Sequence, residues 1–413
     1  MKRTLISNIK ELVQVEETAR PKVCGKDMAK MSTIKDAFLI VEDGRIADFG
    51  TMSALNKEQY FDEAVDATGS MVFPTFCDSH THMVYAGSRE VEYIDKIRGL
   101  SYDEIAKRGG GILNSAKRVQ EASEEQLYDE AMQRLDMMMQ YGTGAVEVKS
   151  GYGMTTEAEM KMLRVIRRMR ENSPLTIKST LLGAHGIPME YRGRQEKFVD
   201  MVIEKMIPRA VDEGLAEFID VFCDEGFFTV EDTDRMLAAG VKRGLRPKIH
   251  ANEMACSGGI QVAVKYDALS CDHLEYTGTA EIECLLHSNT MPTVLPGAAF
   301  FLNMAHAPVR QMMDAGLPVA LASDYNPGSS PSPNMQLILS FACVNYRMLP
   351  EEAINATTIN SGYAMGVSDQ LGSICRGKKA SFYITNPIPT YEYMPYAYGE
   401  NKVGQVFIEG KRV

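Results

Sequence analysis

Two histidines, His80 and His82, are separated by one residue and follow the apolar segment 71–77. In an extended chain, side chains two residues apart point to the same side, so both imidazoles can reach one metal ion. A pair of this kind on its own is more often two polar loop residues. The chain must supply further ligands before the pair predicts a metal site.

Further polar residues stand at the ends of other apolar segments, namely His250, His273 and Asp324. Imidazole and carboxylate ligands suit zinc or iron, and such ions lower the pKa of a bound water to about 7 in favourable sites. We therefore predict one Zn²⁺ or Fe²⁺/Fe³⁺ ion per subunit. The predicted ligands are His80, His82, His250 and Asp324.

Glu253 lies three residues after His250, where a carboxylate can pass a proton from an attacking water to a leaving nitrogen. The plainer interpretation is an acidic residue that the helix dipole favours in a first helical turn. His273 can hydrogen-bond the water instead of the metal. On the catalytic interpretation, the residues that handle protons are Glu253, His273 and Asp324.

The segments that must position these residues alternate between helices and short apolar runs. Ser123 with Gln126, and Thr156 with Glu159, form capping boxes that predict the starts of two helices. The strand candidates are 71–77, 144–148, 177–184, 217–223, 247–250, 268–271, 291–295 and 318–322. Eight strands with helical crossovers predict an α/β fold of the (β/α)8 TIM-barrel type, whose catalytic groups lie at the carboxyl ends of the strands.

Both ends of the chain are rich in strand-forming residues. The apolar run 37–41 precedes the turn 42–44, and the runs 380–384 and 403–408 behave in the same way. We therefore predict a small β-sandwich domain built from residues 1–70 and 367–413. The barrel is predicted to occupy residues 71–366.

The composition is that of an ordinary globular protein, with 45% hydrophobic and 24% charged residues among 413. A net charge of −11 without a long basic run argues against nucleic acid as a partner. No secretory leader or stretch of 18 apolar residues is evident, so we expect no membrane association. Eight cysteines without a CxxC pair predict reduced thiols and a cytoplasmic location.

The motifs around the predicted site resemble the amidohydrolase superfamily and, within it, the imidazolonepropionase family. The resemblance covers about residues 70–375. Its matching stretches are 78–82, 86–90, 109–113, 147–153, 182–185, 248–251, 272–276, 295–298 and 323–330. The HxH element is shared across the superfamily, whereas 147–153 and 326–330 are more specific to this family.

The resemblance implies a metal-dependent hydrolase that converts 4-imidazolone-5-propionate to N-formimidoyl-L-glutamate, the third step of L-histidine degradation, and a homodimer. The substrate-binding residues it implies are Arg89, Tyr152, His185, Glu253, Asn326, Gly328 and Ser329. The guanidinium of Arg89 suits the propionate group of such a substrate. We expect water to add to the carbon between the two ring nitrogens, with Glu253 passing a proton to the departing nitrogen. His273 and Asp324 would orient the water.

Three other features carry weaker predictions. Lys149 lies near the place where binuclear relatives have a metal-bridging carboxylated lysine, and we interpret it as structural. The glycines 109–111 lack a following Lys-Ser or Lys-Thr, so a loop over the site is favoured over a phosphate-binding loop. Asn252 and Met189 replace an Asp and a Pro of the family pattern, and neither is a predicted ligand.

Two alternatives remain open. A different mononuclear amidohydrolase, such as a nucleobase or cyclic-amidine deaminase, would share the metal site but has no use for a carboxylate clamp at Arg89 with Tyr152. A catalytically inactive barrel serving as an assembly scaffold would usually have lost metal ligands. Ammonia release tests the first alternative, and metal analysis tests the second. The ligand types do not discriminate between zinc and iron.

Overall fold

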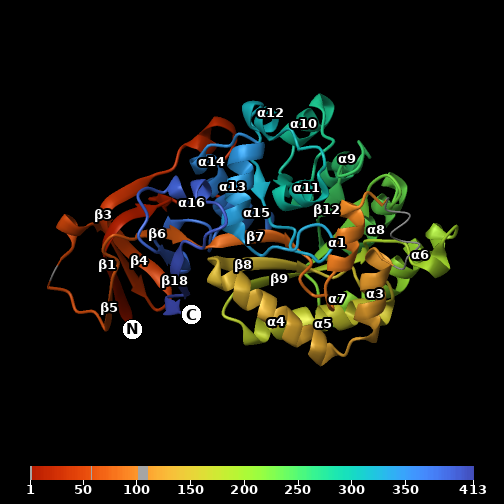
Figure 1. The fold of residues 1–413 in the computed structure, drawn as a ribbon, viewed down its shortest axis with the longest axis horizontal. Helices are drawn as coiled ribbons and strands as arrows, with labels where there is room; N and C mark the ends of the chain where they lie inside the picture. Colours follow the sequence, from red (N-terminus) through yellow and green to blue (C-terminus); the bar gives the residue numbers. More distant parts are fainter. Residues whose placement is uncertain (1, 57, 101–109) are drawn as a thin grey trace.

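The structure is a computed structural model that describes residues 2–56, 58–100 and 110–413. Figure 1 shows a barrel wrapped in helices beside a smaller β-rich part, and both chain termini lie in that β-rich part. No helix among the described residues combines the length and the apolar character that crossing a membrane requires.

Parallel strands form the barrel and neighbour each other in chain order. They are β7 (Phe76–Thr81), β8 (Thr143–Lys149), β9 (Thr176–Ala184), β10 (Phe218–Cys223), β12 (Ile249–Ala251), β13 (Ser270–His273), β14 (Met291–Val294) and β15 (Ala320–Leu321), with β11 (Arg246–Pro247) paired to β10. A parallel bridge between Thr81 and Tyr325 brings the chain after β15 back to β7. The predicted (β/α)8 barrel is confirmed.

The helices that cover the barrel or connect its parts follow the strands along the chain. They are α1 (Glu90–Ile97), α3 (Ile112–Glu121), α4 (Glu124–Gln140), α5 (Thr156–Asn172), α6 (Gln195–Met201), α7 (Ile207–Asp212), α8 (Val230–Lys242), α9 (Gly259–Lys265), α10 (Thr279–Leu286), α11 (Pro296–Leu302), α12 (Val309–Asp314), α13 (Met335–Asn345), α14 (Pro350–Asn355), α15 (Ser361–Ala364) and α16 (Tyr393–Tyr396). Shorter turns are the 3-10 segments η1 (Gly25–Ala29), η2 (Met52–Ala54) and η3 (Met189–Tyr191) and the π segments η4 (Val202–Met206) and η5 (Ala356–Asn360).

The two predicted helix starts differ in outcome. Ser123 caps α4, because its hydroxyl accepts from the backbone N–H of Gln126 at 3.0 Å. The prediction of Thr156 as the cap of α5 is wrong, because the preceding Thr155 accepts from Ala158 N at 3.2 Å. The carboxylate of Glu159 does not return to the cap; it binds the backbone of the loop after β8. The local cap is therefore kept one residue earlier than predicted, while Glu159 binds the loop that precedes the helix.

Strands from both ends of the chain form one mixed sheet in the order β19-β18-β17-β6-β1-β3-β4, with β5 paired to β1. Their bounds are β1 (Arg3–Val13), β3 (Thr33–Glu42), β4 (Arg45–Thr51), β5 (Glu63–Asp66), β6 (Met71–Pro74), β17 (Phe382–Thr385), β18 (Val403–Ile408) and β19 (Lys411–Arg412). A second small sheet pairs β2 (Val15–Glu16) with β16 (Ile374–Cys375). The terminal segments thus build the small β-rich unit that the sequence predicts.

The predicted strand 71–77 is wrong as a single barrel strand. Its first part is β6, which pairs with β1 and β17 of the terminal sheet, and the barrel begins only at Phe76. Both parts are completely buried, so their apolar pattern contains no sign of the change of sheet. The domain limits 1–70 with 367–413 and 71–366 stay a prediction.

Candidate metal centre and active site

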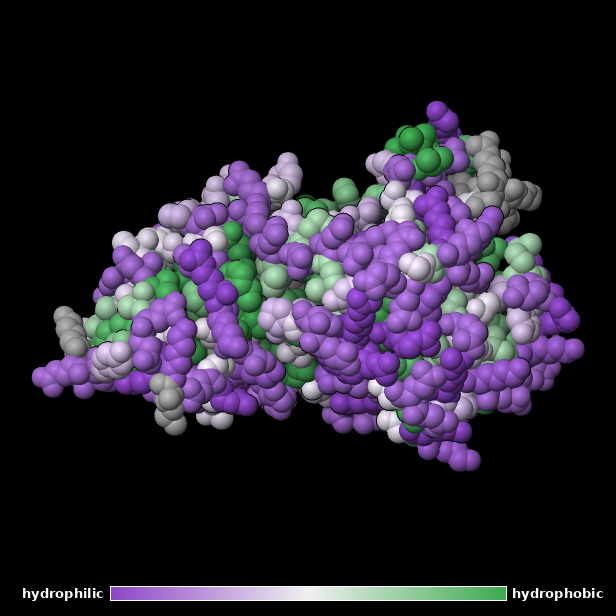
Figure 2. Space-filling view, turned by 90° about the horizontal axis from the view of Figure 1, so that it is seen from below, coloured by the Kyte–Doolittle hydropathy of each residue, from purple (hydrophilic) through white to green (hydrophobic). Residues whose placement is uncertain are grey.

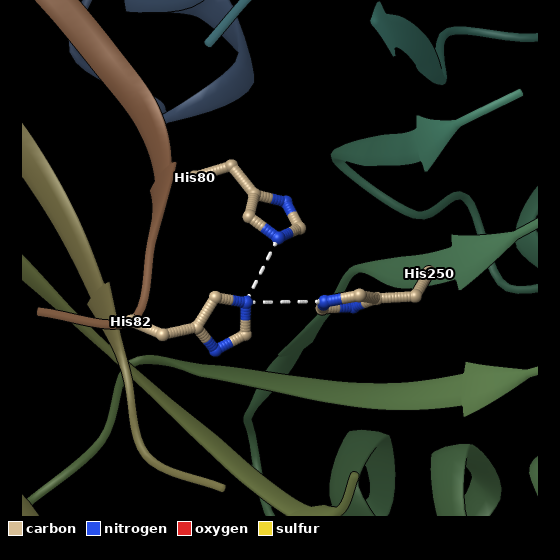
Figure 3. Close-up of side chains that lie close together, drawn as sticks. All are labelled: His80, His82 and His250. Carbon is tan, nitrogen blue, oxygen red and sulfur yellow. Dashed lines mark hydrogen bonds between the residues drawn. The ribbon is translucent and has the colours of Figure 1, made fainter. Parts of the chain in front are cut away.

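Three imidazoles converge at the carboxyl ends of β7 and β12. His82 Nε2 lies 3.1 Å from His80 Nε2 and 3.4 Å from His250 Nε2, and all three side chains are buried. Figure 3 shows the three rings pointing at one another. Asp324 Oδ1 lies 3.6 Å from His80 Nε2 and 3.5 Å from His82 Nε2. The structure therefore brings the three predicted histidine ligands together, and Asp324 lies beside two of them.

Carboxylates behind two of the histidines set the direction of their lone pairs. Asp272 Oδ2 lies 2.7 Å from His80 Nδ1, and Asp220 Oδ2 lies 2.9 Å from His250 Nδ1. These contacts favour the proton on Nδ1 and leave Nε2 as an acceptor. Burial lowers the pKa of His80 and His82 well below the usual histidine value, so their rings are neutral at pH 7. Two acceptor nitrogens, on His80 and His250, thus face the ring of the neutral His82, an arrangement that fits a bound metal cation.

A buried ionic network lies beneath these ligands inside the barrel. Lys149 Nζ lies 2.6 Å from Glu147, 2.8 Å from Asp220 and 3.8 Å from Asp272. Lys248 also binds Glu147 and donates to the carbonyl of Ser79 at 2.9 Å. Lys149 thus contacts both carboxylates that orient metal-site histidines, which agrees with its interpretation as a structural residue.

The backbone at two site residues lies in the left-handed region, with φ of +51° at Asp324 and +85° at His273. Non-glycine residues rarely adopt this conformation, and it concentrates at functional sites where the surroundings hold it. Asp324 N donates to the carbonyl of His80 at 3.0 Å. This bond ties the end of β15 to the histidine pair and fixes the direction of the Asp324 carboxylate.

Glu253 faces His273 across the site. Its Oε2 lies 3.5 Å from His273 Nε2. The carboxylate of Asp224 accepts from the backbone N–H groups of Glu253 at 2.7 Å and Met254 at 2.9 Å, which holds this loop against the end of β10. Burial and the nearby Asp224 raise the pKa of Glu253 to about 8. A carboxyl group that exchanges a proton near neutral pH suits general acid–base catalysis.

A tight loop after Asp324 is organised by Asn326. The amide Nδ2 donates to Asp324 O at 2.6 Å and to Ser329 Oγ at 2.7 Å, and Oδ1 accepts from the N–H groups of Gly328 and Ser329. The Ser329 hydroxyl in turn donates to Asp324 Oδ2 at 3.2 Å. Asn326 therefore shapes the loop, and Ser329 connects it to the predicted metal ligand.

Arg89 lies against this loop and is paired with Glu92. Arg89 Nη2 lies 2.6 Å from Glu92 Oε2, and Nε donates to the same oxygen at 2.7 Å. A Cβ on Gly328 would collide with Arg89 Nη1, so only glycine permits this close approach. The remaining guanidinium edge lies beside the backbone of Gly328.

An aromatic wall adjoins the histidines. His185 stacks on His82 with ring centroids 4.8 Å apart, and the Tyr152 ring lies 5.4 Å from His185. Burial lowers the pKa of His185 to about 3, so the ring is neutral at pH 7. Gly151 has φ of +118° and packs against the His185 ring, which explains the glycine in this motif. The Glu159 carboxylate binds the N–H of Gly151 at 2.9 Å and thereby holds the loop that bears Tyr152.

One cavity of about 660 Å³ collects these side chains. The predicted site residues that line it are His82, Arg89, Tyr152, His185, His250, Glu253, His273, Asp324, Asn326, Gly328 and Ser329. His80 lies buried behind His82. Gly110 also lines the cavity, in agreement with a loop over the site, whereas Gly109 lies outside the described residues.

Several residues that position the site were missed by the sequence reasoning. They are Asp220, Asp224 and Asp272 behind the loops and ligands, Glu92 beside Arg89, and Lys96 in the cavity wall. Acidic residues within otherwise apolar strands were the available signal for Asp220 and Asp272. Lys96 carried no signal, because a helical lysine is ordinarily a surface residue.

Comparison with known proteins places this geometry in a family. The sequence model of the amidohydrolase family matches residues 71–413. The imidazolonepropionases of Christiangramia forsetii and Flavobacterium johnsoniae are each 52% identical over 99% of both chains. A triazine hydrolase variant shares the fold, with a TM-score of 0.76 at 14% identity over 99% of this chain and 94% of that chain. The chain therefore belongs to the amidohydrolase family, and within it to the imidazolonepropionases.

Proposed function

We propose that the chain hydrolyses 4-imidazolone-5-propionate to N-formimidoyl-L-glutamate, the third step of L-histidine degradation. The relatives named imidazolonepropionase support this reaction over nearly the whole chain. The observation that carries the proposal is that Arg89 lines the same cavity as His82 and His250. The guanidinium edge of Arg89 that faces Gly328 gives a hydrolytic site an N–H donor for the carboxylate tail of a ring substrate, a group that a neutral nucleobase lacks.

The predicted ion is one Zn²⁺ or iron ion per subunit. Neutral imidazoles and a carboxylate accept both metals. The residues that would hold it are His80, His82, His250 and Asp324. When bound, such an ion lowers the pKa of a water molecule and polarises a carbonyl group.

The product corrects one expected step. In N-formimidoyl-L-glutamate the carbon between the two nitrogens still has both, and a new carboxylate has appeared. Water must therefore add to the ring carbonyl carbon, and the bond between that carbon and the ring nitrogen must break. Addition to the carbon between the nitrogens, our expectation from the sequence, would leave a formyl group and an amide instead.

The side chains provide the proton transfers that this bond cleavage needs. With its pKa raised to about 8, Glu253 is mostly protonated at pH 7 and can give a proton to the departing nitrogen; a proton lost by the attacking water then restores the acid form of Glu253. His273 is kept neutral by burial and faces Glu253, so it can orient the attacking water or the carbonyl oxygen. Asp324 lies beside His80 and His82 and can accept a hydrogen bond from the water. Together they favour the tetrahedral geometry over the flat ring.

The remaining cavity residues would hold the substrate. Arg89 faces the propionate, while Tyr152 and His185 pack against the ring. The loop around Gly328 and Ser329, shaped by Asn326, closes the opposite side. Together these contacts would hold the ring carbonyl carbon of the substrate at a fixed position relative to Glu253 and Asp324.

We further propose a homodimer in the cytoplasm. Exposed apolar side chains continue from α1 across α11 to α13, at Val91, Ile97, Phe300 and Val344. The rings of Tyr93 and Phe301 and of Phe300 and Phe341 connect these helices. Figure 2 shows a group of hydrophobic residues, in green, that projects from the surface at the upper right. An exposed apolar surface of this kind suits a protein interface. The eight free cysteines suit a reducing compartment.

Loss of ultraviolet absorbance of freshly generated 4-imidazolone-5-propionate under anaerobic conditions tests the reaction. We expect rapid loss with metal-loaded protein, no rate above spontaneous decay for His80→Ala, and a raised KM for Arg89→Ala. Metal content is measured on the same batches. Persistence of the substrate together with ammonia release from a cyclic amidine or nucleobase would support the deaminase alternative.

A further inference from the structure

Lys96 lies on α1 and lines the same cavity as Arg89, although no motif singles it out. Its Nζ donates to the backbone carbonyl of Gly328 at 3.1 Å. Arg89 Nη1 packs against the same glycine. Two cationic groups therefore meet at Gly328, in the cavity that His82 and His250 also line.

The charges of these two groups are compensated differently. Glu92 binds Arg89 through Nε and Nη2, and it also accepts from Gly111 N at 2.9 Å and Asn114 Nδ2 at 3.2 Å. These partners lower the pKa of Glu92, so Arg89 and Glu92 form a pair of zero net charge. Within the described residues, Lys96 forms no ion pair; only the neutral carbonyl of Gly328 accepts from it.

We propose that Lys96 is a carboxylate-binding residue of this cavity and supplies its net positive charge for the propionate of the substrate. The inference rests on the proposed function and adds a residue to its specificity. Arg89, held by Glu92, then provides a fixed N–H edge next to Gly328. Lys96, which forms no ion pair with the described residues, provides the positive charge that favours an anion over a neutral ligand at this place.

The surroundings of Lys96 agree with this role. The side chain is half-buried, and burial together with the nearby Arg89 lowers its pKa. Removing a cation partly from water is unfavourable, and the described residues offer Lys96 no ion pair that would offset this cost. A carboxylate arriving between Lys96 and Arg89 removes that cost and gains charge-assisted hydrogen bonds from both.

A pair of stable probes separates the carboxylate contribution from the rest of the ligand. One probe is 3-(imidazol-4-yl)propionate, and the other is 4-propylimidazole, which has the same ring and chain length but no charge on its tail. Binding of both to the metal-loaded protein is measured by isothermal titration calorimetry. The variants are Lys96→Gln, which keeps an N–H donor for Gly328, and Lys96→Arg, which keeps the charge. Lys117→Gln is the matched control, because Lys117 is an exposed lysine on the neighbouring α3.

For Lys96→Gln we expect the Kd of the propionate probe to rise by about 10- to 100-fold, the range of one charge-assisted hydrogen bond. The Kd of 4-propylimidazole should stay unchanged. Lys96→Arg should recover most of the loss, and Lys117→Gln should match the wild type. With 4-imidazolone-5-propionate, Lys96→Gln should raise KM and leave kcat near the wild-type value, since the residue does not touch the reacting atoms.

Two results would overturn the proposal. Unchanged binding of the propionate probe to Lys96→Gln would show that Lys96 does not contact the carboxylate. An equal weakening of both probes would show that Lys96 acts only by holding the Gly328 loop. Failure of the proposed function would give a different result. The wild-type protein would then leave 4-imidazolone-5-propionate intact, whatever the binding measurements on the Lys96 variants show.

Discussion

At the scale of single residues, the protonation state of Glu253 decides the direction of proton transfer. The pKa of this carboxyl is raised to about 8 by burial and by Asp224, so the acid form dominates below pH 8 and is lost as the pH rises through that value. We expect kcat to fall as the pH rises through about 8. A pH–rate profile of the wild type and of Glu253→Gln measures it.

Glu253→Gln should lower kcat by about 10²- to 10⁴-fold with little change in KM, because the amide has no acidic proton to give. The variant should also lack the decline centred near pH 8. Glu225→Gln is the matched control, since Glu225 is an exposed acid at the rim of the same cavity. An undiminished kcat in Glu253→Gln would remove this residue from the proton transfer.

Gly328 makes room for the Arg89 guanidinium, and a methyl group there would displace it. We expect Gly328→Ala to raise KM for 4-imidazolone-5-propionate about tenfold or more through loss of a charge-assisted hydrogen bond. Gly278→Ala is the control, because its Cβ would meet only the end of the Glu281 side chain at 3.0 Å. A wild-type KM in Gly328→Ala would contradict the position of Arg89.

The residue types and their spacing allowed the metal ligands to be predicted, because histidines and an aspartate recur at the ends of several apolar segments. The supporting carboxylates could not be predicted in the same way. Asp220 and Asp272 lie on different strands from the histidines they contact, and Lys149 lies on a third. The pairing of these buried charges depends on which strands are neighbours in the folded barrel.

At the scale of elements, strand β13 delivers Asp272 to the back of His80, which comes from β7. Asp272→Asn should weaken metal affinity by about 10- to 100-fold, because the carboxylate orients the ligating ring and raises its basicity. Competition with a chelator of known affinity measures the change. Asp267→Asn, at an exposed position before the same strand, is the control. Equal affinities in the two variants would show that Asp272 does not orient the ligand.

The elements were predictable to different extents. Most barrel strands are continuous apolar segments, and a strand buried on both faces keeps this pattern whatever its neighbours are. Because both parts of the run 71–77 are buried, its apolar pattern did not show that β6 belongs to the terminal sheet and β7 to the barrel. The cap of α5 is Thr155 instead of the predicted Thr156, and Glu159 binds the N–H of Gly151 instead of the cap.

At the scale of the whole molecule, Tyr383 of β17 connects the terminal sheet to the barrel. Its ring stacks on Phe73 at 5.3 Å and lies 5.4 Å from Phe76, and the side chain is buried. Tyr383→Ala should lower the free energy of unfolding by about 3–5 kcal/mol, the usual cost of removing a buried aromatic ring. Urea unfolding followed by circular dichroism measures this change. Tyr398→Ala, at a side chain that is 76% exposed, should change it by less than about 0.5 kcal/mol.

An equal midpoint for the two tyrosine variants would mean that the terminal sheet contributes little to the stability of the barrel. It would also favour two independent domains at the predicted limits. A single transition that moves only in Tyr383→Ala would instead show that the sheet and the barrel unfold together. The apolar pattern of the sequence cannot distinguish joint unfolding from independent unfolding, because Tyr383 and its partners Phe73 and Phe76 are all buried.

The central claim is that the chain adds water to the ring carbonyl of 4-imidazolone-5-propionate. Turnover in H₂¹⁸O followed by mass spectrometry of the product tests it most directly. We predict N-formimidoyl-L-glutamate with one ¹⁸O in the new carboxylate, at a rate that His82→Ala abolishes. A product with ¹⁸O in a formyl group, or substrate that decays no faster than without protein, would contradict the account.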